Sequence, residues 1–151
     1  PGQVGDVGKQ DDAAGDQLSA LFLALYVRGM HYTNVLSNFF ESSQHVKLPA
    51  ESLTSTGANC IDGTLVFASA LEALGMETGI VFVPGHAFVA VRLEPGSGWL
   101  MAMETTVVAD GDPGAALVAG VEQYNANADS GTVKTVWVHE ERLNGFTPLP
   151  F

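Results

Sequence analysis

The chain has only one cysteine, Cys60, among its 151 residues. A lone cysteine has no partner for an internal disulfide, and it excludes a zinc site built from several cysteines. The thiol therefore acts either as a small buried side chain or as a reactive group. The count does not fix the compartment in which the protein works.

Basic residues are also scarce. Lys and Arg number 6 against 17 Asp and Glu, which gives a formal net charge of -11. A surface with this excess of negative charge repels phosphate groups, and no basic cluster is visible in the sequence. We therefore expect no nucleic-acid partner and no attraction to anionic membranes.

Long apolar runs are missing as well. No run reaches the roughly 18 residues that a helix needs to cross a bilayer, so we expect no membrane span. The most apolar early stretch, residues 18 to 27, follows no basic segment and is not expected to be a signal peptide. Because the chain begins with Pro1, we expect it to be part of a larger product that can carry other domains.

The remaining sequence predicts one α+β domain. Residues 1 to 15 are poor in apolar side chains and are expected to form a flexible N-terminal arm, with a single domain over residues 16 to 151. Helices are predicted from Asp16 to about Gly29, from Pro49 to Leu53, from Cys60 to Leu74 and from about Gly114 to Tyr124. Strands are predicted over residues 79–83, 87–93, 98–103 and 132–138, with turns between the first three. Helices followed by an antiparallel sheet are typical of the α+β class.

Cys60 stands where a loop ends and the firmest helix begins, in Gly57-Ala58-Asn59-Cys60-Ile61. The first turn of a helix offers unpaired N–H groups and a partial positive charge, and both stabilise a thiolate. Asp62 in the same turn stabilises the helix but opposes thiolate formation, so we assign it no catalytic role. This placement makes Cys60 a candidate nucleophile.

His86 and Glu104 are the candidate base and orienting carboxylate. His86 opens one predicted strand and Glu104 closes the next, and the hairpin between them is centred near residue 95 or 96. In an antiparallel pair the start of one strand lies beside the end of the other, so the two side chains are expected to meet. The sequence offers no comparable reason for a contact between Cys60 and His86.

Other interpretations remain open for these residues. Cys60 can be a buried small apolar residue, His86 a strand-start histidine bonded to backbone, and Glu104 a solvated strand end. The same three side chains can also form a metal-dependent hydrolase site, although no closely spaced ligand pair supports one.

Four segments together resemble the transglutaminase-like superfamily, and the bacterial transglutaminase-like cysteine proteases most of all. The segments are Gly57-Ala58-Asn59-Cys60-Ile61-Asp62-Gly63, Ala70-Leu71-Glu72-Ala73-Leu74-Gly75-Met76, Gly85-His86-Ala87-Phe88-Val89 and residues 99 to 106. They match a glycine-led Cys at a helix start, a helix ending in Leu-Gly, a His-Ala-aromatic strand, and a Trp-containing strand ending in an acid and Thr. The match covers residues 40 to 108, about half of the chain.

This resemblance implies a papain-like core with Cys60 as nucleophile, His86 as base and Glu104 where the family usually has Asp. For the oxyanion hole, the Cys60 backbone N–H is the natural first donor because it lies at a helix start. Gln44 is placed like the glutamine that supplies the second donor in papain-like enzymes, and it can equally be a surface residue.

We therefore expect a cysteine hydrolase or acyl transferase, a protease or amidase, that attacks a peptide or protein amide and forms a thioester on Cys60. No cofactor is expected. The alternative is a transglutaminase-like module of a larger protein that binds a partner without catalysis. The sequence does not separate water from an amine as the acyl acceptor.

Overall fold

The computed structural model describes residues 9–34 and 45–148. Its elements, in chain order, are α1 (Lys9–Val27), β1 (His31–Tyr32), α2 (Pro49–Ser55), β2 (Gly57–Ala58), α3 (Cys60–Ala73), β3 (Thr78–Val83), β4 (His86–Arg92), β5 (Leu100–Met103), η1 (Val108–Asp110), α4 (Pro113–Asp129), β6 (Lys134–Trp137) and α5 (Val138–Leu143).

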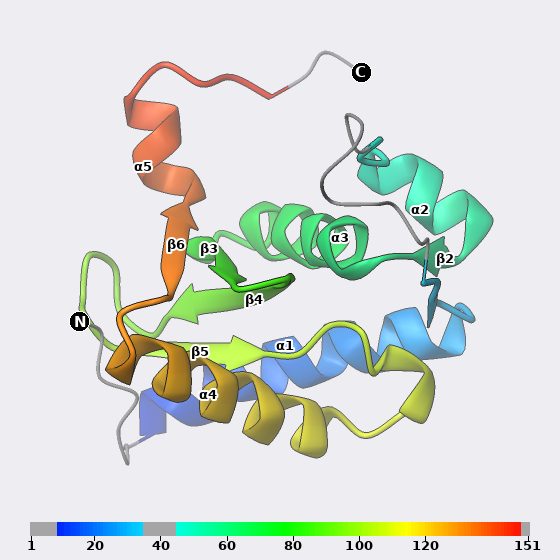
Figure 1. Cartoon of the computed structure of the whole chain (residues 1–151), viewed down its shortest axis with the longest axis horizontal. Helices are drawn as coiled ribbons and strands as arrows, with labels where there is room; N and C mark the ends of the chain where they lie inside the picture. The colour runs from blue at the N-terminus through cyan, green and yellow to red at the C-terminus, as the bar shows by residue number, and fades with distance from the viewer. Residues whose placement is uncertain (1–8, 35–44, 149–151) are drawn as a thin grey trace.

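A four-stranded sheet forms the centre, in the order β5-β4-β3-β6 (Figure 1). All its neighbouring strands are antiparallel. β3 and β4 are joined by a tight turn in which Gly85 has a φ of 73°, a left-handed conformation that glycine adopts without steric cost. In the next hairpin Val89 lies opposite Met103, which centres that hairpin on residue 96. The antiparallel sheet and its helices confirm the α+β expectation.

The sheet is covered by helices on both faces. Side chains alternate along β4, so that Val89 and Val91 pack with α1 and α3 in one core cluster. Phe88 and Ala90 point the other way and pack with Tyr124 of α4 in a second cluster. The strand that begins at His86 is therefore buried on both sides, and its first residue is fixed by the packing of those that follow.

The start of α3 is held by a capping box. The Asn59 side chain accepts from the Asp62 N–H at 2.9 Å, and the Asp62 carboxylate in turn accepts from the Asn59 N–H. These reciprocal bonds satisfy two backbone donors and fix where the helix begins. Cys60 is consequently the first helical residue, as the sequence predicts.

The predictions for both ends of the chain are wrong. α1 begins at Lys9 rather than Asp16, so residues 9 to 15 are helical and do not belong to the expected arm; residues 1 to 8 lie outside the described part. The reason is that Ala14, only 7% exposed, extends the apolar stripe of Leu18 by one turn into the core. At the other end, α5 was not predicted. It begins at Val138, the last residue of the predicted strand, with two glutamates in its first turn and Arg142 in its last.

Within the described ranges, no helix is both long and apolar enough to pass through a bilayer.

Candidate active site

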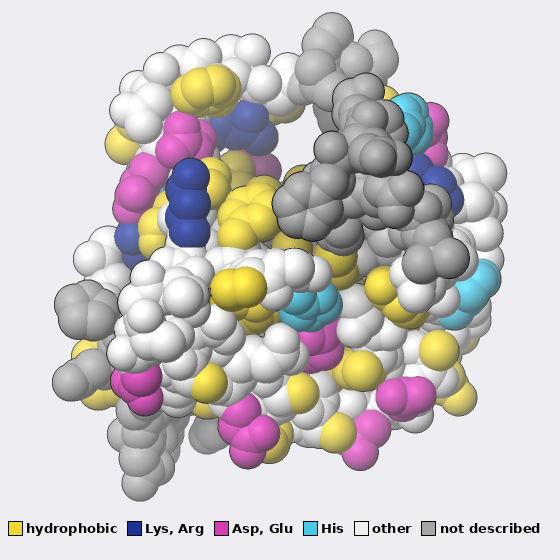
Figure 2. Space-filling model, viewed as in Figure 1, with side chains coloured by type: hydrophobic (Ala, Val, Ile, Leu, Met, Phe, Trp, Pro, Cys, Tyr) yellow, Lys and Arg dark blue, Asp and Glu magenta, His cyan; other side chains and the backbone are white. Residues whose placement is uncertain are grey.

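The candidate site lies where three elements converge. The beginning of α3, the beginning of β4 and the end of β5 are on the same side of the domain (Figure 1). Cys60 opens α3, His86 opens β4, and Glu104 directly follows β5. In the view of Figure 2, histidine and acidic side chains meet near the centre of the face.

His86 and Glu104 form a direct hydrogen bond, as the hairpin predicted. The distance from His86 Nε2 to Glu104 Oε2 is 2.7 Å. Val89 lies opposite Met103, the last residue of β5, so the next position along β4 that would face Glu104 is Phe88. His86 therefore reaches the carboxylate diagonally, from two residues further along the same face. Diagonal neighbours in a sheet are farther apart than directly opposed ones, and a long side chain can span that separation.

Cys60 interacts with the imidazole from the other side. Because Nε2 of His86 is bonded to Glu104, Nδ1 is the nitrogen left for the thiol. A hydrogen bond with the His86 side chain is the main influence that lowers the pKa of Cys60; partial burial opposes it, and the Ala87 and Ile61 backbone N–H groups add to it. Cys60 as a whole is half-buried. The thiol and the imidazole therefore lie close enough for each to shift the pKa of the other, which the sequence could not predict.

The pKa of His86 moves in the opposite direction. Its hydrogen bonds to Cys60 and then to Glu104 raise the pKa from 6.5 to about 9, against the effect of partial burial. A lowered thiol pKa beside a raised imidazole pKa favours a thiolate–imidazolium pair at neutral pH. That pair is the reactive form of a cysteine nucleophile.

Glu104 is buried, with 4% of its surface exposed, and is surrounded by donors. Its Oε1 accepts from the Thr106 N–H at 2.9 Å and from the Thr106 hydroxyl at 2.8 Å, while Oε2 accepts from His86 and from Gln123 Nε2, each at 2.7 Å. Burial alone would raise the pKa of Glu104, but these donors and the charge of His86 bring it to about 2. The carboxylate therefore stays ionised across the useful pH range.

Sequence reasoning missed Gln123 and the role of Thr106. Thr106 could have been found, because a hydroxyl two residues after an acid can bond back to it. Gln123 lies 19 residues away on α4, and the only sequence signal was the small residues Ala116 and Gly120 on the same helix face. Their spacing indicates close packing against the sheet, which brings Gln123 to the site.

Of the two predicted oxyanion donors, the structure describes one, the backbone N–H of Cys60. As the first residue of α3, Cys60 has a backbone N–H that helix geometry leaves without an intrahelical acceptor. Gln44, the predicted second donor, lies outside the described residues. Asp62 is buried and accepts the Lys47 N–H at 2.9 Å, so it ties the chain just upstream to the start of α3.

A metal centre gains no support from the geometry. In residues 9–34 and 45–148, no group of three or more His, Cys, Asp or Glu side chains is arranged to hold a metal ion. Both oxygens of Glu104 already accept hydrogen bonds from N–H or O–H donors. A metal would have to displace those donors to bind it.

Comparisons of the chain with family models, with curated proteins and with solved structures find no match.

Proposed function

We propose that the chain is a cysteine hydrolase or acyl transferase of transglutaminase-like type, acting on an amide through a thioester. Cys60 is the nucleophile, His86 the general base and acid, and Glu104 the group that orients the imidazole. The observation that carries the proposal is the arrangement of one imidazole between a thiol at a helix start and a buried carboxylate. A papain-like core is part of it, supported by a nucleophile helix packed on an antiparallel sheet that carries the other two residues.

The reaction follows from this arrangement. The Cys60 thiolate attacks the carbonyl carbon of an amide, and the negative charge that develops on oxygen is stabilised by the Cys60 backbone N–H. The His86 imidazolium gives its Nδ1 proton to the departing nitrogen, the C–N bond breaks, and a thioester and a free amine remain. Water or a second amine then loses a proton to His86 as it attacks the thioester, which releases the acyl product and restores the thiolate.

Glu104 acts through His86. Its ionised Oε2 accepts the Nε2 proton, which holds the ring in the tautomer and the orientation that leave Nδ1 facing the thiol. A carboxylate also stabilises the imidazolium that forms in each half-reaction. The acceptor can be water, as in a protease or amidase, or an amine, as in cross-linking.

Iodoacetamide tests the reactive pair. We expect Cys60 to be alkylated at a nearly constant rate well below pH 8, because the thiolate is already present there, and this behaviour should disappear in His86→Ala. His139→Ala is the matched control, since His139 is an exposed histidine away from the site. An ordinary thiol profile in the wild type, unchanged by His86→Ala, would contradict the proposal and favour a binding module without catalysis.

The acyl-enzyme is tested with p-nitrophenyl acetate. We expect a burst of p-nitrophenol that matches the enzyme concentration and an acetyl group on Cys60, detected by mass spectrometry. Cys60→Ser and His86→Ala should each remove the burst. If acetylation occurs on other residues at the same rate, Cys60 is not the nucleophile.

A further inference from the structure

The triad carboxylate is held by a fourth element, helix α4. Gln123 Nε2 donates to Glu104 Oε2 at 2.7 Å, the same oxygen that faces His86. Thr106 occupies the other oxygen, Oε1. Among the described side chains, Gln123 and His86 are thus the two that bond to Oε2 of Glu104.

The position of Gln123 is set by close packing of α4 on β5. The Glu104 N–H donates to the Ala116 carbonyl at 3.0 Å. One turn further, a methyl group placed on Gly120 would lie 2.6 Å from the backbone of Ala102, a distance that only glycine permits. Ala116, Gly120 and Gln123 are spaced four and three residues apart, so they share one helix face.

We propose that Gln123 is a positioning residue for the reaction, holding Glu104 in the rotamer that directs Oε2 at His86. This inference rests on the proposed function, because its effect is on the Cys60–His86 pair. Helix α4 holds Gln123 in place, because its close packing on β5 at Gly120 fixes how far the Gln123 side-chain amide lies from the Glu104 carboxylate.

A neutral donor suits this position for an electrostatic reason. A buried carboxylate needs several hydrogen bonds to remain ionised, and Gln123 adds one without adding charge. A cation there would compete with the imidazolium for Oε2, and an acid would repel the carboxylate. With an amide, His86 keeps its place as the positive partner of Glu104.

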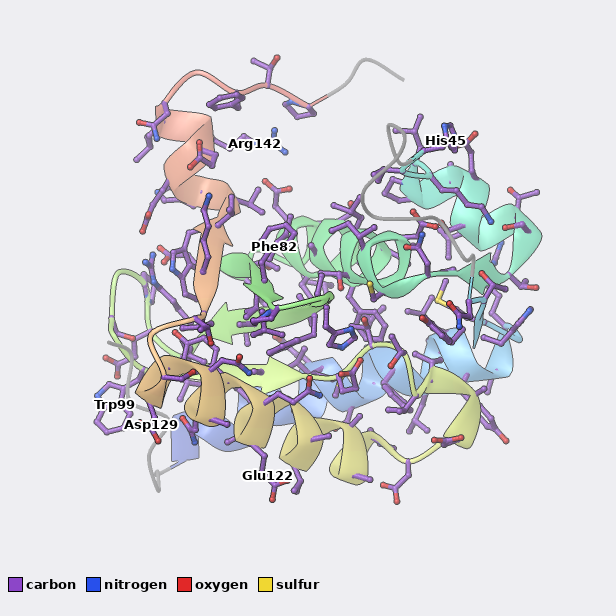
Figure 3. The ribbon with its side chains drawn as sticks, viewed as in Figure 1. His45, Phe82, Trp99, Glu122, Asp129 and Arg142 are labelled. Atoms are coloured by element: carbon purple, nitrogen blue, oxygen red, sulfur yellow. The ribbon has the colours of Figure 1, made fainter. Side chains whose placement is uncertain are left out.

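Among residues 9–34 and 45–148, few other charges face this network. His86 comes from β4, Cys60 lies beyond it on α3, and Asp62 on α3 is engaged with the Lys47 N–H. On α4 the nearest acid, Glu122, is exposed and points away from the sheet (Figure 3). A change in the Gln123 side chain therefore acts on Glu104 and His86 before it acts on any other ionisable group in the described part of the chain.

The first test compares Gln123→Leu with Glu122→Leu, its neighbour on the same helix. Cys60 acylation by p-nitrophenyl acetate and alkylation by iodoacetamide are measured from pH 5 to 10 on the whole chain, with folding checked by circular dichroism. We expect Gln123→Leu to be about tenfold slower at pH 7, which is the scale of one lost hydrogen bond to a charged group. The pH above which the rate of acylation declines should be lower in Gln123→Leu than in the wild type. A carboxylate that has lost one hydrogen bond is less well positioned, so it stabilises the His86 imidazolium less. Glu122→Leu should stay within about twofold of the wild type.

The second test, Gln123→Glu, separates positioning from structural support. At pH 5 the introduced acid can be protonated and donate to Oε2 as the amide does, whereas at pH 8 it is an anion beside Glu104. We expect the ratio of variant to wild-type acylation rate to be near one at pH 5 and to fall at least tenfold by pH 8. A ratio that is constant across pH would overturn the inference, because a merely structural defect does not depend on the charge of this group.

The two proposals fail in different ways. If His86→Ala removes the reactivity of Cys60 but both Gln123 variants keep the wild-type rate and pH profile, the positioning role is wrong and the proposed function stands. If His86→Ala has no effect on Cys60, the proposed function is wrong.

Discussion

The two ends of the central sheet carry charged side chains in different surroundings. At the candidate site, Glu104 is 4% exposed and each oxygen accepts two hydrogen bonds. At the opposite end, Arg142 of α5 is paired with Glu72 of α3 at 3.2 Å, and their side chains are 34% and 38% exposed. Figure 2 shows basic side chains gathered over β6 and α5, away from the site.

The same contrast appears in how a helix is docked at each end. α4 is packed so closely on β5 that Gly120 leaves no room for a methyl group. α5 leaves a cavity of about 180 Å³, lined by residues that include Met76, Thr78 and Val138, and ion pairs such as Arg92–Glu140 at 2.6 Å fasten it. A buried carboxylate surrounded by donors can set the pKa of a neighbour, whereas exposed pairs are screened by water and salt. We therefore expect changes at the first end to alter chemistry and changes at the second to alter stability slightly.

The largest effect is expected from Glu104→Gln. The amide keeps the length of the side chain but not its charge, so the imidazolium loses its anionic partner and the ring can take the wrong tautomer. Acylation of Cys60 by p-nitrophenyl acetate should fall by about 10³- to 10⁴-fold at pH 7. A fall of less than tenfold would mean that Glu104 does not act on the reaction.

Glu104→Asp tests length at constant charge. The diagonal register between β4 and β5 makes the wild-type contact depend on the longer side chain, so the shorter acid should miss His86 by about the length of one bond. Misplacement of this size costs roughly a hundredfold in rate. An Asp variant as fast as the wild type would show that side-chain length is not matched to the register.

The contact between His86 and Glu104 could be predicted because it is local. One hairpin fixes it, and the turn residues and the alternation of side chains reveal that hairpin in the sequence. The hairpin centre estimated near residue 95 or 96 agrees with the observed register, and the start of α3 at Cys60 follows from its capping residues. The α+β class follows from the same periodicities.

The rest depends on how separate elements pack, and no local pattern determines it. Cys60 can approach His86 only if α3 packs against the sheet at one particular position. Gln123 can reach Glu104 only if α4 packs against the sheet at one particular position as well. Helix ends were misjudged for a related reason, since α1 gains a turn when Ala14 enters the core. Gln44 lies outside the described residues, so its predicted role as an oxyanion donor stays a prediction.

A moderate effect is expected on stability in acid. A pKa of about 2 for Glu104, against an ordinary 4.5, means that the folded state favours the ionised carboxylate. This contribution is present above about pH 4.5 and is lost as the pH falls through about 2; it amounts to roughly 3 kcal/mol. Urea unfolding at pH 6 and pH 3 should show a smaller loss of stability in Glu104→Gln than in the wild type.

Glu77→Gln is the control for that measurement at the far end. The pKa of Glu77 is also lowered, first by the Gly96 N–H and then, against slight burial, by Arg92. This carboxylate is more exposed than Glu104, so its removal should change the acid dependence much less. If Glu77→Gln and Glu104→Gln change the acid dependence of stability equally, burial is not the reason that the carboxylates at the two ends differ.

The smallest effect is expected from Arg142→Met, which breaks the pair with Glu72 while keeping an apolar stem of similar length. Exposed pairs contribute about 0 to 1 kcal/mol, so the free energy of unfolding should fall by no more than that, and less at high salt. The alkylation profile of Cys60 should be unchanged, because the pair lies at the other end of the sheet from His86. A shift of that profile would mean that α5 is coupled to the reactive pair through β3, and the functional separation between the two ends would be wrong.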